Sequence, residues 1–346
     1  MEQKIFDPDG VGVDNGTYFG LPFAPETAEL VLISAPWDVT VSYGAGAAYA
    51  PRRRHRSLDA AGFLRSAGPG AWRRGIATAD VDYSLQESSQ RLRTDAARVI
   101  DHLEGGGCLE DDYVVRKVRR VNEGCMAMNA NVEAQASRWL DAGKTVGLVG
   151  GDHSTPYGLI RALGARHAAF GILHVDAHCD LRDAYEGFEF SHASVMFNVL
   201  RDVPQVTKIA QVAVRDFSES EAALAASSGR VATFDDLSLA AALFRGETWD
   251  AQCRRIVDAL PQEVYVSFDI DGLTFENCPH TGTPVSGGLT FNQAVWLLDT
   301  LTRSGRRIIG FDVVEVCPAA DDRIDAITGA RMLWKLCGQT LKSNEK

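Results

Sequence analysis

The chain has 346 residues, of which 45% are hydrophobic and 23% are charged. This composition is typical of a globular protein and excludes a mainly disordered chain. The formal net charge is −11, from 35 lysines and arginines against 46 aspartates and glutamates, which argues against nucleic acid or a membrane surface as the partner, because proteins that bind these are usually basic.

The seven cysteines are irregularly spaced and include no CxxC pair. This usage favours a reducing compartment over a disulfide scaffold or a zinc knuckle. The N-terminus shows no basic region followed by an apolar stretch, and no run of 18 apolar residues occurs. We therefore expect a cytoplasmic protein without a membrane span.

In chain order, a Gly-, Pro- and Asp-rich N-terminal arm at residues 1–28 precedes a single α/β domain at residues 29–346. The polar segment 84–125 is interpreted as a helical insertion. Short apolar runs predict strands at 31–35, 146–149, 170–175, 206–214, 264–268 and 307–311. Longer runs predict helices at 128–142, 156–165, 254–260 and 325–341. This alternation predicts a mainly parallel sheet with helices on both faces.

Acidic and imidazole side chains directly follow four of the predicted strands. They are Asp152 and His153 after the strand at 146–149, Asp176, His178 and Asp180 after 170–175, Asp269 and Asp271 after 264–268, and Asp312 and Glu315 after 307–311. In an open α/β sheet, ligands bind beyond the carboxyl ends of the strands. We therefore expect these side chains to meet at one edge of the sheet.

The spacing within two of these groups supports convergence. Asp176, His178 and Asp180 are two residues apart, as are Asp269 and Asp271. In extended backbone, residues with the same parity point to the same side. The small or apolar residues between them are then expected to pack away from the site.

Four converging carboxylates need positive charge. Two unit charges ~4 Å apart interact with about 4 kcal/mol at an effective dielectric of 20, so such carboxylates either take up protons or hold cations. Two divalent ions would balance the four aspartates, with His153 and His178 as neutral ligands. Mixed oxygen and imidazole ligands suit Mn²⁺, and also Zn²⁺, Ni²⁺ or Fe²⁺, and two such ions can turn a bridging water into a hydroxide nucleophile.

Three blocks of the sequence resemble the signature blocks of the ureohydrolase family, which contains arginase, agmatinase, other guanidino-acid hydrolases and formiminoglutamase. The blocks are Gly150–Ser154, His174–Asp180 and Ser267–Leu273, and Thr281–Pro284 with Gly287 and Gly288 match the stretch after the third block. The resemblance implies an arginase-like catalytic domain, a three-layer α/β/α sandwich with a mainly parallel sheet and a binuclear manganese centre. It also implies a homo-oligomer, either a trimer or a hexamer.

The resemblance assigns roles residue by residue. One metal would be bound by His153 and Asp180, the other by His178 and Asp271, and both would be bridged by Asp176 and Asp269. Asp180 would also orient the bridging hydroxide. Glu315 would pair with the substrate guanidinium, and His192, on a mobile loop, would shuttle protons. His174 has the parity of a ligand, but the family does not use that position, so it is expected to be a core histidine. Cys179 lies between two ligands and points away from them by parity, so it is expected to pack in the core.

The implied activity is hydrolysis of the C–N bond of a guanidino compound to urea and an amine, by attack of a metal-bridging hydroxide. Agmatine, a guanidino acid and guanidine itself are the candidate substrates, because the sequence is most similar to an agmatinase-like subgroup. The metals are expected to be two Mn²⁺ ions, with Ni²⁺ as the alternative. Two other functions remain open: hydrolysis of formimidoylglutamate with release of formamide, and a metal-binding relative with a regulatory or structural role.

The loop that leads to His192 does not decide which chemical group the substrate carries at the end away from the metals. It carries acidic residues and Arg182, so the charge of the substrate tail is undecided. It also carries Tyr185, Phe188 and Phe190. These rings either close over the metals and shorten the pocket, or pack into the core or a subunit interface.

Overall fold

The structure is a computed structural model that describes residues 15–50, 70–319 and 322–345. Residues 1–14 of the predicted N-terminal arm therefore lie outside the described residues. The strands form one eight-stranded sheet in the order β2-β1-β3-β8-β7-β4-β5-β6, and each neighbouring pair is parallel. They are β1 (Leu30–Ser34), β2 (Ile76–Thr78), β3 (Thr145–Val149), β4 (Phe170–Val175), β5 (Val206–Val212), β6 (Val231–Phe234), β7 (Glu263–Asp269) and β8 (Arg307–Val314).

The strands form because short apolar runs place side chains on both faces of the sheet in alternation. In β7, Tyr265 packs into the core on one face, whereas Val264 and Val266 pack into the core on the other. Parallel strands that are covered on both faces are apolar at nearly every position. The mainly parallel sheet, which was predicted from the alternation of short apolar runs with helices, is confirmed.

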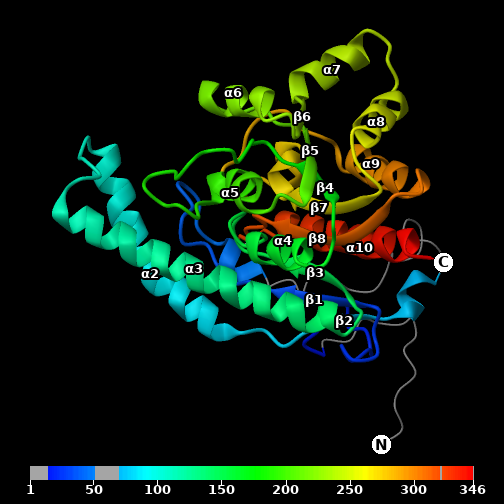
Figure 1. Cartoon of the computed structure of the whole chain (residues 1–346), viewed down its shortest axis with the longest axis horizontal. Helices are drawn as coiled ribbons and strands as arrows, with labels where there is room; N and C mark the ends of the chain where they lie inside the picture. The colour runs from blue at the N-terminus through cyan, green and yellow to red at the C-terminus, as the bar shows by residue number, and fades with distance from the viewer. Residues whose placement is uncertain (1–14, 51–69, 320–321, 346) are drawn as a thin grey trace, which may run out of the picture.

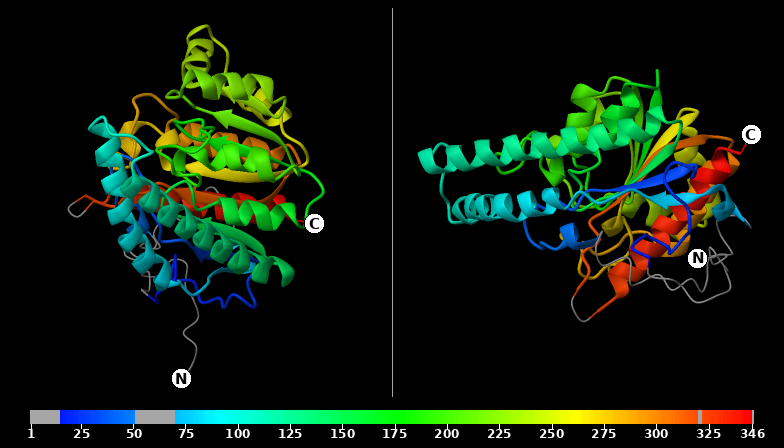
Figure 2. Two further views of the ribbon diagram at one scale, coloured as in Figure 1. Left: turned by 60° about the vertical axis from the view of Figure 1, so that its left-hand side comes forward. Right: turned by 90° about the horizontal axis from the view of Figure 1, so that it is seen from below.

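Helices cover both faces, so the predicted three-layer α/β/α sandwich is confirmed (Figures 1 and 2). One core contains residues of α2 (Tyr83–Glu104), α3 (Asp112–Asp141), α4 (Tyr157–Gly164), α5 (Val195–Asp202) and α6 (Glu219–Ser227). The other contains residues of α7 (Asp236–Phe244), α8 (Trp249–Asp258), α9 (Phe291–Arg303) and α10 (Ile324–Ser343). In the described residues, no helix is long and apolar enough to cross a bilayer.

Helices α2 and α3 form a hairpin that reaches out beyond the sheet (Figure 2, right). Residues 84–125, interpreted from the sequence as a helical insertion, fall in α2, the connection at 105–111 and α3, whereas the predicted helix start at residue 128 is wrong. Val114, Val121, Cys125 and Met128 are all buried at helical spacing, so one apolar stripe runs through the boundary and α3 continues without a break. Lys117 and Arg120 both form ion pairs with Asp95, which tie α3 to α2.

The edge of the sheet that carries the polar residues also differs in detail from the prediction. Strand β8 continues to Val314, so Asp312 lies inside a strand and not after one. Its carboxylate accepts hydrogen bonds from the Tyr265 hydroxyl at 2.7 Å and from the Phe268 backbone N at 3.1 Å. Asp312 thus supports the sheet beneath the site.

Candidate functional site

The four strands that carry the predicted site residues are consecutive neighbours in the middle of the sheet. The order β3-β8-β7-β4 places their carboxyl ends side by side. Because ligands in open α/β sheets bind at this end, the sheet itself assembles the site. The convergence predicted from the sequence is observed.

The first cluster is centred on the His153 ring. Its Nδ1 lies 2.8 Å from Asp176 Oδ2, 3.0 Å from Asp180 Oδ2 and 3.2 Å from Asp269 Oδ2. Its Nε2 lies 2.9 Å from the Ser267 hydroxyl, which belongs to β7. This contact fixes the ring so that Nδ1 faces the three carboxylates.

The second cluster is centred on the His178 ring, which is half-buried. Its Nδ1 lies 3.2 Å from Asp271 Oδ2 and 3.4 Å from Asp176 Oδ1. The other oxygen of Asp271 accepts a hydrogen bond from the Ala177 backbone N at 3.0 Å. Asp176 therefore presents one carboxylate oxygen to each cluster and lies between them.

The site aspartates converge for a different reason from the one predicted, which was that residues of the same parity in extended chain point to one side. Strand β4 ends at Val175, and Asp180 has the left-handed φ of 53°, which is uncommon for a residue other than glycine. Asp269 ends β7, and a 3₁₀ turn at Ile270–Gly272 follows, with the Asp271 backbone N donating to Asp269 Oδ1 at 2.9 Å. Tight turns, rather than extended chain, bring Asp180 and Asp271 to the site.

Burial and mutual repulsion set the charge state of the carboxylates. Burial, followed by the nearby Asp176, raises the pKa of Asp180 above its usual range. Burial, followed by Asp271 and Asp176, raises the pKa of Asp269 well above it. Burial also tends to raise the pKa of Asp176, but the contacting histidines outweigh it and hold that pKa well below its usual range. Asp176 is therefore the carboxylate of the three that keeps its negative charge most firmly.

The histidines respond in the opposite sense. Burial tends to lower the pKa of His153, but contacts with Asp176 and Asp180 raise it well above its usual range. Burial also tends to lower the pKa of His178, but the contacts with Asp271 and Asp176 raise it well above its usual range. In the described residues these carboxylates form ion pairs with histidine rings and with no lysine or arginine. The site therefore attracts positive charge.

The donor atoms fit metal ions. His153 Nδ1 and Asp180 Oδ2 are buried and make no hydrogen bond, although they are only 3.0 Å apart. Two sets of donor atoms lie within 4.8 Å of one another, one formed by His153, His174, Asp176 and Asp180 and the other by Asp176, His178 and Asp271. Such oxygen and imidazole sets suit first-row divalent cations.

His174 lies closer to this chemistry than the sequence suggested. It is fully buried, as expected of a core histidine, yet its Nε2 lies 2.8 Å from Asp176 Oδ2. Its Nδ1 lies 3.3 Å from Gln211 Nε2. The ring therefore contacts the same Asp176 oxygen that faces His153 in the first cluster. Cys179, also assigned to the core, is buried there.

Glu315 lies beside the first cluster. Its backbone has a left-handed φ of 57°, and its N donates to Gly151 O at 2.8 Å. Oε1 accepts a hydrogen bond from the His153 backbone N at 2.9 Å, whereas Oε2 is buried and makes no hydrogen bond. Burial, followed by the charge of Asp152, raises the pKa of Glu315 well above its usual range. A Cβ at Gly282 would lie 3.3 Å from Oε2, so a side chain there would crowd this carboxylate.

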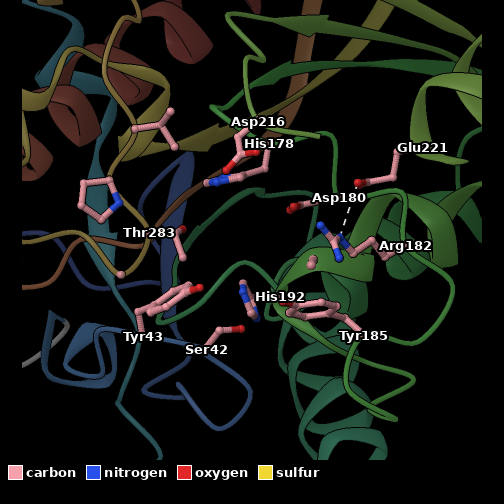
Figure 3. Close-up of a pocket in the computed structure, with 14 residues that line it drawn as sticks. Ser42, Tyr43, His178, Asp180, Arg182, Tyr185, His192, Asp216, Glu221 and Thr283 are labelled. Atoms are coloured by element: carbon pink, nitrogen blue, oxygen red, sulfur yellow. Dashed lines mark ion pairs between the residues drawn. The ribbon is translucent and has the colours of Figure 1, made fainter. Parts of the chain in front are cut away.

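A cavity of about 510 Å³ opens onto the two clusters (Figure 3). His178 and Asp180 line it together with residues from four segments of the chain: Ser42, Tyr43, Arg182, Tyr185, His192, Ala193, Asp216, Glu221, Gly282, Thr283, Pro284 and Val285. Its size and mixture of polar and aromatic walls are those of a small-molecule site.

His192 lies in the cavity wall, between the Tyr43 side and Tyr185 (Figure 3). Its backbone N donates to the Thr40 hydroxyl at 3.1 Å, and its Nδ1 lies 3.3 Å from the Ser191 hydroxyl. Burial, followed by the nearby histidines of the two clusters, lowers the pKa of His192 to about 3. The ring is therefore neutral at physiological pH.

The aromatic loop residues separate into two groups. Tyr185 lines the cavity, 6.2 Å from His192 between ring centroids. Phe188 and Phe190 instead pack into the core, so they do not close over the clusters. Arg182 stacks on the Tyr185 ring at 4.4 Å, with its Nε 3.4 Å from Glu221 Oε2.

Sequence reasoning missed several residues of the cavity wall, among them Tyr43, Asp216 and Glu221. None of them follows a strand predicted to carry the site or belongs to one of the family blocks, so their positions became visible only once the loops were placed. Ser267 belongs to the third block, but its contact with His153 was not predicted.

Comparison with known proteins agrees with this geometry. The model of the Arginase family matches residues 28–338, and the chain belongs to this family. The N(1)-aminopropylagmatine ureohydrolase of Thermus thermophilus is 34% identical over 208 residues, which are 60% of this chain and 66% of that protein. The agmatinase of Pyrococcus horikoshii is 27% identical over 322 residues, covering 91% of this chain and 93% of that one. The matched part thus spans just under two thirds of the Thermus protein.

Solved structures share the fold. The agmatine ureohydrolase of Thermoplasma volcanium has a TM-score of 0.67 at 22% identity and covers 93% of this chain and 92% of that one. The proclavaminate amidino hydrolase of Streptomyces clavuligerus has a TM-score of 0.71 at 21% identity and covers 97% and 98%. The arginase-like fold and the agmatinase-like resemblance expected from the sequence are both confirmed.

Proposed function

We propose that this chain hydrolyses the C–N bond of a guanidino compound and releases urea and an amine. The observation that carries the proposal is the buried Glu315 carboxylate with its unpaired Oε2, set beside two histidine–aspartate clusters. Family membership and the agmatinase-type relatives support the same reaction class.

The clusters are proposed to hold two divalent cations. His153 and Asp180 would bind one ion, His178 and Asp271 the other, and Asp176 and Asp269 would bridge them. When bound, such ions supply Lewis acidity and lower the pKa of water so that it attacks at neutral pH. We expect Mn²⁺, with Ni²⁺ as the alternative, because both accept oxygen and imidazole ligands.

Glu315 is proposed to bind the guanidinium group of the substrate. A guanidinium is planar and permanently charged, so a carboxylate can engage two of its N–H groups at once. The hydrogen bond from the His153 backbone N holds Oε1 in place, and Oε2 has no competing partner. This arrangement would fix the reacting carbon above the clusters, where Asp180 is proposed to orient the attacking water.

His192 is proposed to move a proton. Its Nδ1 is near Ser191, which leaves Nε2 as the candidate carrier. A neutral ring can accept the proton that the attacking water loses. It would then deliver this proton to the amine nitrogen as the C–N bond breaks, because a neutral amine leaves more readily than its anion.

The position of Arg182 in the cavity wall favours the alternative function, hydrolysis of formimidoylglutamate. A guanidinium in the cavity wall could pair with an acidic substrate. However, Arg182 is already near Glu221, and Asp216 adds a further carboxylate to the wall. The balance of charge in the cavity therefore favours a guanidino compound with a neutral or cationic tail.

A substrate panel tests the proposal. Purified chain loaded with Mn²⁺ or Ni²⁺ is incubated with guanidine, 4-guanidinobutanoate, agmatine, arginine and formimidoylglutamate, and urea and formamide are measured separately. We expect urea from at least one guanidino compound and no formamide. Formamide alone would establish the alternative, and neither product would favour a regulatory or structural relative.

The assembly and location predicted from the sequence stay proposals. We propose a homo-oligomer, a trimer or a hexamer, and a cytoplasmic location. Light scattering of the purified chain would test the first, since a monomer would contradict it. Fractionation of the source cells would test the second.

A further inference from the structure

The chain segment between Asp180 and His192 forms a loop whose base is closed by its own backbone. The Arg182 backbone N donates to Ala193 O at 3.1 Å. This bond holds the two ends of the loop together beside the clusters. It does not hold the far end of the loop, which lies away from the sheet.

The far end is held by a residue of the α2–α3 hairpin. Asn122 of α3 donates from Nδ2 to Gly187 O at 3.2 Å and accepts at Oδ1 from the Glu189 backbone N at 3.0 Å. Asn198 of α5 donates to Glu189 O at 2.9 Å. One asparagine amide from a distant part of the sequence thus pairs with both a carbonyl and an N–H of the loop tip.

The loop tip packs closely against the α2–α3 hairpin, and the loop backbone has an uncommon conformation. Gly187 has a φ of +82°, and a Cβ there would lie 2.9 Å from Leu109 Cδ2 and 3.3 Å from Val118 Cγ2. Ala184 and Glu186 also have left-handed φ values, 56° and 55°. Residues with side chains adopt this conformation rarely, so it persists only where surrounding contacts impose it.

We propose that Asn122 is a positioning residue, which holds the 182–192 loop in the conformation that places Tyr185 and His192 in the cavity wall. The α2–α3 hairpin then acts as a support for the substrate loop, outside the cluster of proposed metal ligands. The catalytic consequence rests on the proposed function, whereas the structural part, anchoring of the loop tip, does not.

Hydrogen exchange tests the anchoring without any activity. In Asn122→Ala, we expect the peptide that covers residues 183–191 to exchange about tenfold faster or more, since two hydrogen bonds to its backbone are lost. Asn122→Asp keeps the acceptor for Glu189 but sets an oxygen against Gly187 O, so it should give an intermediate increase. Asn131→Ala is the matched control, because Asn131 is also in α3 and part-buried but bonds to Asp82. Unchanged exchange in both Asn122 variants would overturn the proposal.

Kinetics test the catalytic consequence. On the best substrate of the panel, Asn122→Ala should lower kcat about tenfold while KM changes less and two metals stay bound. In a His192→Ala background the same change should cost much less, because the group that it positions is gone. Equal losses in both backgrounds, or faster exchange with unchanged kcat, would show that Asn122 is merely structural. A wild-type chain inactive on the whole panel would refute the proposed function, while the exchange result would still decide whether Asn122 anchors the loop.

Discussion

The floor and the wall of the cavity are built in different ways. The floor consists of side chains at the ends of four neighbouring strands. His153, Asp176, Asp180, Asp269 and Asp271 are buried there, and His178 is half-buried. The wall consists of loops that contacts from distant parts of the chain hold in place, and it includes Tyr43, which is 76% exposed. We infer that the floor sets the chemistry and the wall sets the choice of substrate.

The largest effect is expected from damage to the floor. Asp269→Asn removes a charge that would be shared by both ions, so turnover should fall by about three orders of magnitude or more, together with metal content. Elemental analysis and urea release measure the two losses on one sample. Asp183→Asn is the control, since Asp183 is exposed on the loop. Full metal content and full activity in Asp269→Asn would remove this residue from the centre.

Glu315→Gln tests whether this residue, which lies beside the first cluster, binds the substrate or supports the metal centre. Glutamine keeps an acceptor for the His153 backbone N but loses the charge that would pair with the guanidinium. We expect kcat/KM to fall by about two to three orders of magnitude with both metals retained. Loss of the metals instead would mean that Glu315 supports the centre and does not bind substrate.

His192→Ala tests proton transfer from the wall. We expect kcat to fall roughly 10²-fold, with metal content and substrate affinity unchanged. His102→Ala is a matched histidine control, because His102 pairs with Asp111 at the end of α2. A kcat that equals the wild-type value across the pH profile would exclude His192 from the mechanism.

A smaller effect is expected from the charge of the wall. Asp216 is exposed in the cavity wall, where it could pair with a cationic substrate tail. Asp216→Asn should lower kcat/KM for agmatine about two- to fivefold, which is the range for an exposed ion pair, and leave guanidine unaffected. Equal losses for both substrates would mean that Asp216 does not recognise the tail.

The last prediction concerns stability and not turnover. The pKa of His192 is lowered to about 3 in the folded chain, from 6.5 as its ordinary value. Between these values the unfolded chain binds a proton that the folded chain does not, so acid favours unfolding. In metal-free protein, wild type should therefore lose stability relative to His192→Asn as the pH falls from about 6.5 to about 3. Denaturant unfolding at several pH values measures this, and a constant difference would contradict it.

Much of the floor could be predicted from the sequence, because strands and their polar ends leave local patterns. Apolar runs followed by Asp176 or Asp269 identify both the strand and its functional end. The conformation after the strands was not predictable, since residue parity assumes extended chain, whereas Asp180 and Asp271 are placed by tight turns.

The wall was much harder to predict, because it depends on long-range contacts. Phe188 and Tyr185 are three residues apart in one loop, yet one packs into the core and the other lines the cavity. Gly187, which lies between them, accepts a hydrogen bond from Asn122, which lies more than 60 positions earlier in the chain. No local pattern marks an asparagine that bonds to a distant loop.

The central claim is that the floor is a two-metal centre on which hydrolysis depends. Its most direct test is a titration of chelator-treated, verified metal-free chain with Mn²⁺, and separately with Ni²⁺, while bound metal and urea release are measured together. We predict no activity without metal, and activity that rises until about two ions are bound per chain. Full activity in the metal-free chain, or saturation at one ion, would contradict the two-metal centre.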